Sequence, residues 1–143
     1  MEDRLKRKLD ALFEERERRQ RQGEEEGRRV SDQRAEVESR IAERFSAVVL
    51  PVLETVTNYL ESKSLIASTA QEDRGTSVMF QVPPGSHIRI IGRTEDMTVD
   101  VYPTIRGQSG AVVAVPLDQL TTEWFEAQNL EFVEGVLIGP WMS

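Results

Sequence analysis

Two different hydrophobic repeats meet near Ser64 of this 143-residue chain, and together they constrain its fold more than any other feature. Before Ser64 the apolar residues recur at steps of three and four, which is the spacing of one face of an α-helix. After Ser64 they alternate with polar residues in short runs, which is typical of half-buried β-strands. Helical segments kept apart from a run of strands indicate the α+β class, so we predict an α+β fold.

Residues 1–30 are predicted to form a charged helical arm that is partly flexible. Acidic side chains precede basic ones by four positions, as in Glu15 and Arg19, which is the favoured order for ion pairs on a helix. The arm has one short apolar stripe, formed by Leu5, Leu9, Leu12 and Phe13. The stretch that follows has no large apolar residue and contains Gly23 and Gly27, so we expect a weak joint there.

A second amphipathic helix is predicted over residues 31–63, with Ser31 as its N-cap. Its apolar stripe is thin before Ile41 and broad after Phe45, so we expect the first part to meet a single neighbour and the second to enter a core. Pro51 lies inside this helix. Because its ring clashes with the preceding turn and its nitrogen carries no proton, we expect a kink near Pro51. A fresh helix that starts at Pro51 is the alternative.

The thin part of this stripe predicts self-association. Val30, Val37 and Ile41 have no evident partner within their own domain, and the same helix of a second copy would provide one. We therefore predict a homodimer formed through a coiled-coil-like N-terminal helix, with these three residues at the contact. An arm that stays disordered until a partner protein binds is the alternative.

Residues 64–143 are predicted to form an antiparallel sheet and a C-terminal helix, and to build one globular domain together with residues 31–63. The alternating runs predict five strands, at residues 64–71, 76–82, 87–93, 97–102 and 111–115. The connections are too short for parallel crossovers, so we expect a five-stranded antiparallel meander. Thr121 is a good N-cap for the last helix. One sheet face is apolar and the other mostly polar, which predicts two helices packed on one face.

The predicted core lies between the sheet and the two helices that cover it. Its expected members are Phe45, Val52, Val56, Phe80, Ile90, Val99, Phe125 and Val133. Asn129 falls within the broad apolar arc of the C-terminal helix. Because buried amides are nearly always hydrogen-bonded, we expect Asn129 to bond a neighbouring backbone group or to lie at the rim of the core.

The polar face of the predicted sheet carries the candidate binding residues. His87, Arg89 and Arg93 alternate along one strand and therefore share a face, and Asp100 and Tyr102 are expected opposite them on the next strand. We assign these five residues to a site for an anionic ligand or an acidic peptide. A solvated face with cross-strand ion pairs is the simpler interpretation, since surface ion pairs are common and seldom functional.

Catalytic and metal-binding signals are missing from the sequence. The chain has no cysteine and one histidine, which excludes thiol nucleophiles, disulfides and cysteine- or histidine-rich metal sites. The carboxylate pairs Glu72/Asp73 and Glu95/Asp96 lie in predicted turns, where acidic residues are expected for backbone reasons. We therefore expect no enzyme activity, no cofactor and no metal ion.

Charge and length limit the remaining functions. The net charge of −7 argues against coating nucleic acid, and the longest apolar run, residues 47–53, is far shorter than the roughly 20 residues that a membrane span needs. We expect no signal peptide, no nucleic-acid or membrane partner, and a cytoplasmic location, which suits a chain without cysteine.

The sequence thus favours a non-enzymatic oligomerising adaptor or accessory protein that acts through contacts with itself and with a partner protein of unknown identity. The alternative is a ligand- or peptide-binding module, with a chaperone-like activity as a variant. Such a module would use the polar sheet face or an exposed sheet edge, where an extended peptide can add as a further strand.

Overall fold

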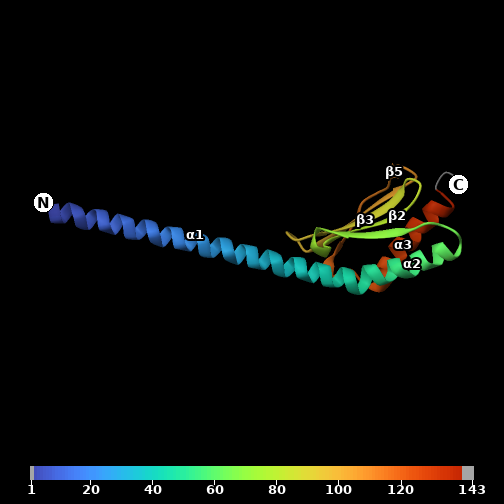
Figure 1. Ribbon diagram of the computed structural model, residues 1–143, viewed down its shortest axis with the longest axis horizontal. Helices are drawn as coiled ribbons and strands as arrows, with labels where there is room; N and C mark the ends of the chain where they lie inside the picture. The colour runs from blue at the N-terminus through green and yellow to red at the C-terminus, as the bar shows by residue number, and fades with distance from the viewer. Residues whose placement is uncertain (1, 140–143) are drawn as a thin grey trace. The chain divides into compact units, whose positions relative to one another are not determined.

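The computed structural model describes residues 2–139 of the chain and shows an α+β fold (Figure 1). The chain divides into two units, Met1–Glu36 and Val37–Ser143. The first unit is helical along its described length and belongs to helix α1, Glu2–Arg44. All described strands and all described buried side chains lie in the second unit, which therefore contains the hydrophobic core.

Helix α1 is continuous where the sequence predicted a weak joint at the two glycines and the start of a second helix. It passes through Gly23, Gly27 and Ser31 without a break, so the N-cap expected at Ser31 is wrong. Glu, Arg and Gln are good helix formers, and they surround both glycines, which explains why the helix continues. Ion pairs on its surface, such as those of Glu15 with Arg18 and Arg19, support it locally.

The irregularity expected near Pro51 is a π-helical turn at Phe45–Val49, after which helix α2 spans Leu50–Ser62. Pro51 therefore stands in the first turn of an α-helix, the position where its missing N–H is least costly. The wider turn accommodates the proline ring without ending the helical path. The chain thus stays helical through this region, as expected for a single irregular helix. A new α-helical segment nevertheless starts at Leu50, one residue before Pro51.

The sheet is an antiparallel meander, as predicted, but it has six strands where five were expected. The strands are β1 Ser68–Glu72, β2 Ser77–Val82, β3 Ser86–Arg93, β4 Thr98–Ile105, β5 Gln108–Ser109 and β6 Val113–Pro116. Their order is β1-β2-β3-β4-β5, and β6 also pairs with β4. The additional strand, β5, follows a two-residue turn in which Arg106 and Gly107 have φ of 49° and 81°. Positive φ at both positions is the backbone that joins tight hairpins.

Helices α2 and α3, Thr122–Leu137, cover the same face of the sheet (Figure 1). Thr121 is the N-cap of α3, as predicted, and its Oγ1 accepts a hydrogen bond from the backbone N–H of Trp124 at 3.2 Å. The rings of Phe80 on β2 and Phe132 on α3 meet edge to face, with centroids 6.2 Å apart. This contact fixes α3 against the sheet.

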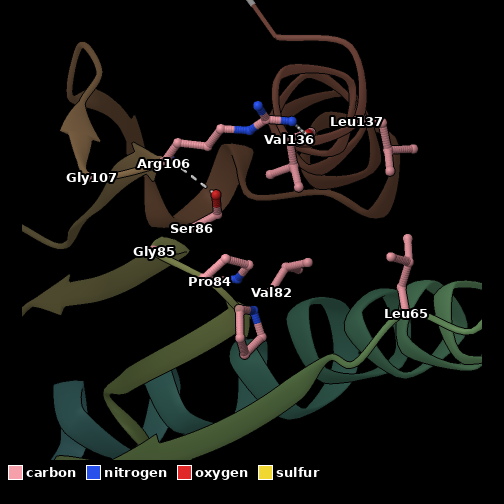
Figure 2. A pocket seen from close by; sticks show the side chains of 10 residues that line it. Leu65, Val82, Pro84, Gly85, Ser86, Arg106, Gly107, Val136 and Leu137 are labelled. Carbon is pink, nitrogen blue, oxygen red and sulfur yellow. Dashed lines mark hydrogen bonds between the residues drawn. The ribbon is translucent and has the colours of Figure 1, made fainter.

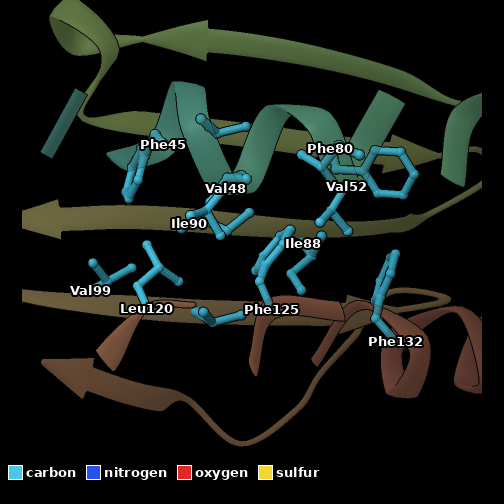
Figure 3. Packing of buried hydrophobic residues seen from close by; sticks show 14 of the residues in the cluster. Phe45, Val48, Val52, Phe80, Ile88, Ile90, Val99, Leu120, Phe125 and Phe132 are labelled. Carbon is cyan, nitrogen blue, oxygen red and sulfur yellow. The ribbon is translucent and has the colours of Figure 1, made fainter. Parts of the chain in front are cut away.

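The core fills the space between these helices and the strands, as predicted (Figure 3). Six of the expected residues are buried, namely Phe45, Val52, Phe80, Ile90, Val99 and Phe125. Val56 and Val133 are only partly buried and pack against the cluster from its edge. Their partial exposure matters because both also line a surface groove.

Ile41 belongs to this core, which corrects the expectation that it lacks a partner in its own domain. Its side chain is fully buried and packs on Gly92 of β3, where a Cβ would lie 2.3 Å from Ile41 Cγ2. Val37, one turn earlier, also packs partly against the core. Of the three predicted oligomerisation residues, only Val30 is exposed, so the predicted contact cannot use Ile41 while this packing persists.

Candidate functional site

The five residues of the predicted binding site lie on the sheet face that the helices leave open. The register of β3 and β4 places Arg89 opposite Tyr102 and sets Asp100 one pair further along the same face. Arg93 Nη1 lies 3.3 Å from Asp100 Oδ2, and the Tyr102 hydroxyl donates to the same oxygen at 3.2 Å. His87 is paired in register with Thr104 and Gln81, further along β3.

Several polar groups of this sheet face are hydrogen-bonded or ion-paired with one another. Asp100 is buried, and its hydrogen bond raises the pKa of Arg93 above the usual range, with Asp96 contributing next. Arg93 is therefore engaged with two carboxylates of its own chain. His87 and Arg89, both half-buried, are the remaining basic groups of the predicted site. The geometry matches cross-strand ion pairing, and anion binding here stays a prediction.

A pocket of about 650 Å³ lies where the β2–β3 and β4–β5 turns meet the end of α3 (Figure 2). Its lining includes Arg106, whose backbone N–H donates to Ser86 Oγ at 2.9 Å. The Arg106 guanidinium donates to the Val136 carbonyl at 3.3 Å, and Gly107 N–H donates to the Gly85 carbonyl at 2.8 Å. These bonds join the two turns to the end of α3 and fix the wall of the pocket.

A second hollow, of about 580 Å³, lies between α2 and α3 and is called the α2/α3 groove. It is lined by Pro51, Val52, Thr55, Val56, Tyr59, Leu60, Thr122, Glu126, Asn129, Leu130, Val133 and Leu137. Tyr59 from α2 is 62% exposed, and Leu130 and Leu137 from α3 are 68% and 51% exposed. Large apolar side chains that gather around a groove, rather than scatter singly, mark an interaction surface.

Asn129 lies at this groove with an unsatisfied amide. Its side chain is 1% exposed, and neither its Nδ2 nor its Oδ1 has a hydrogen-bond partner among the described residues. Of the two expected placements, the bond to a nearby backbone group is therefore wrong, and Asn129 instead lies at the edge of the core, where it lines the groove. A buried polar group without a partner costs roughly 1–3 kcal/mol, so an isolated Asn129 is destabilising. The apolar arc of α3 indicated burial at this position but could not show that the amide lacks a hydrogen-bond partner among the described residues.

The two helices that form the groove carry an excess of acidic residues. Helix α2 contains two glutamates and helix α3 contains four, and neither includes a lysine or arginine within its bounds. Glu126 itself lines the groove. The nearest basic residue in the sequence, Lys63, follows α2 and lies with its Nζ 5.7 Å from the centre of the Tyr59 ring. An apolar floor between acidic helices selects for apolar groups flanked by cations.

The first unit carries its own apolar surface, the arm stripe formed by Leu5, Leu9, Leu12 and Phe13. These four side chains are between 47% and 65% exposed. Their spacing places them on one face of α1. Sequence periodicity found this stripe, although the predicted oligomerisation contact was assigned further along the helix.

Comparison with known proteins gives no further guidance, because no family model, no curated protein and no solved structure matches this chain. Within residues 2–139 no group of three or more acidic or histidine side chains is placed to hold a metal ion. No helix in that range is both long and apolar enough to cross a bilayer. The candidate functional surfaces are therefore the arm stripe, the α2/α3 groove and the polar sheet face.

Proposed function

We propose that this protein is a non-enzymatic oligomerising adaptor that acts through protein–protein contacts. The observation that carries the proposal is the arm stripe, four large apolar side chains exposed together on one face of a helix. Within its described residues, 2–36, the first unit is a single helix and has no second element to cover them. A narrow apolar stripe on a charged helix is the surface that another protein segment buries.

Self-association is the simplest outcome of such a surface, since every copy brings both the stripe and its possible partners. The proposed contact uses the first turns of α1, with Val30 as a further exposed apolar position. It no longer includes Ile41, which is buried in the domain core. We also propose a cytoplasmic location, for which the lack of cysteine is the supporting feature.

Light scattering during gel filtration tests this function. The intact chain should have a mass that is a multiple of 16.3 kDa, and Leu9→Glu with Leu12→Glu should reduce it to 16.3 kDa. The matched control is Ala11→Glu with Gln22→Glu, which adds the same charge on the opposite face of the same helix. A monomeric intact chain, or a stripe variant that keeps the mass of the intact chain, would contradict self-association through the arm.

A second candidate function is peptide binding by strand addition at β1. Among the described strands β1 pairs only with β2, and all five of its side chains are exposed, so one of its edges has no strand partner there. Main-chain hydrogen bonds from an extended peptide could satisfy that edge. Deuterium exchange tests the idea, because a bound peptide would slow exchange at residues 68–72 and leave β3 unchanged.

A further inference from the structure

We propose that the α2/α3 groove of one copy is the binding site for the arm stripe of a second copy. The inference rests on the proposed function, because it takes self-association through the arm as given and names the surface that receives it. Three features of the described residues support this assignment. They are the apolar match, the opposite charges and the unsatisfied amide of Asn129.

The apolar match has the form of a helix bound in a groove. The arm presents Leu5, Leu9, Leu12 and Phe13 at positions i, i+4, i+7 and i+8, the usual anchor spacing for this mode of recognition. The groove offers Val56 and Val133 along its walls, and Tyr59 and Leu130 stand exposed at its margin. A docked helix would cover these side chains and the stripe at the same time.

Two arms packed on each other explain the stripe less well. A coiled coil is indicated by apolar positions that recur over at least three or four heptads. The arm's repeat ends at Phe13, and the charged residues Arg16 and Arg19 occupy the next positions of that face. Two arms would therefore share only a short apolar contact, whereas the groove is a preformed site for one short stretch of helix.

Charge also favours the groove as the binding site for the arm stripe. Residues 4–8 contain four cations and no acid, and Lys6 and Lys8 fall on either side of the arm stripe on a helical wheel. The charged residues of the two helices that form the groove are all glutamates, two on α2 and four on α3. Docking would thus bring the cationic stretch of the arm toward two helices whose charged residues are all acidic, with Glu126 in the groove lining itself. Such complementarity raises the association rate and selects the partner.

Asn129 supplies the third argument, because a buried amide with neither donor nor acceptor satisfied indicates a missing partner. Its Nδ2 needs an acceptor and its Oδ1 needs a donor. Gln20 continues the face of the arm stripe beyond Arg16 and carries both kinds of group in one side chain. An arm in the groove can therefore satisfy what the isolated domain leaves unpaired.

A mixing experiment tests the assignment. The arm variant is Leu9→Glu with Leu12→Glu, and the groove variant is Tyr59→Glu with Leu130→Glu, both at positions more than 60% exposed. Each variant alone should be a 16.3 kDa monomer by light scattering. An equimolar mixture should recover a species of twice that mass, because the groove variant still has an intact arm and the arm variant still has an intact groove. Asn58→Glu with Ala127→Glu, exposed and outside the groove lining, should assemble like the intact chain.

The outcomes separate this inference from the proposed function. A groove variant that assembles like the intact chain, beside a monomeric arm variant, would mean that arms bind elsewhere and would overturn the inference alone. An arm variant that stays assembled would overturn both. Two monomeric variants that fail to associate on mixing, or a control that is also monomeric, would overturn the inference. Circular dichroism should show unchanged folding, and Leu137→Glu, at an exposed groove position, replaces any groove variant that unfolds.

Discussion

The contact between Ile41 and Gly92 can be tested by a double-mutant cycle. A methyl group at residue 92 would lie 2.3 Å from Ile41 Cγ2 and 3.1 Å from Ile41 Cδ1. Carbon atoms pack best at about 3.5–4.0 Å, so Gly92→Ala forces a shift of more than 1 Å between the helix and the strand. Overpacking of this kind costs about 1–3 kcal/mol. Ile41→Ala, which leaves a cavity under a fully buried side chain, should cost about 2–5 kcal/mol.

The double variant, Gly92→Ala with Ile41→Ala, is the informative one. Because the new methyl group then enters space that Ile41 has vacated, the loss of stability should be smaller than the sum of the two single losses by about 1–3 kcal/mol. The free energy of unfolding from urea titration measures all three values. Additive losses, or a neutral Gly92→Ala, would show that α1 does not pack on β3 at this point. Gly27→Ala is the control, since nothing lies within 4 Å of a Cβ there.

In the monomeric arm variant Leu9→Glu with Leu12→Glu, Asn129→Leu should raise the free energy of unfolding by about 1–2 kcal/mol, because it removes a buried amide that has no partner within one copy, and an unchanged melting temperature would show that the amide is satisfied within its own copy. Phe125→Ala should cost about 3–5 kcal/mol in urea titration, and a negligible loss would mean that α3 presents another face to the core. If the polar sheet face binds anions, phosphate should shift the NMR signals of residues 87–93 and Arg89→Glu should abolish those shifts, whereas a titration without shifts would leave only ion pairing there.

Much of the fold followed from the sequence because its pattern is local. Alternation identified five of the six strands and the faces of β2, β3 and β4, and short connections required antiparallel pairing. Thr121 was recognisable as an N-cap because its role depends on residues within one turn. The continuity of α1 was missed because Gly23 and Gly27 were given more weight than the strong helix formers around them.

The candidate surfaces were only partly predictable because they depend on contacts between distant residues. The small size of Gly92 has no visible meaning in the sequence, because it matters only once β3 lies beneath Ile41. Since this contact buries Ile41 within its own domain, Ile41 is not available for the predicted dimer contact. The groove forms between two helices that are neighbours in space but have all the strands between them in the sequence, so no local pattern describes it. The pairing of Arg93 with Asp100 was anticipated from strand alternation, since cross-strand neighbours follow from register.

The exposure of every described side chain but Glu15 across the first 36 residues has a consequence for dynamics. A helix without buried apolar contacts opens locally at little cost, so its amide protons should exchange with deuterium far faster than those of the second unit. Such a segment can be stabilised by binding while the contacts of the core stay in place. Substitutions in the arm can therefore adjust the strength and lifetime of association without removing any contact within the core of the globular unit.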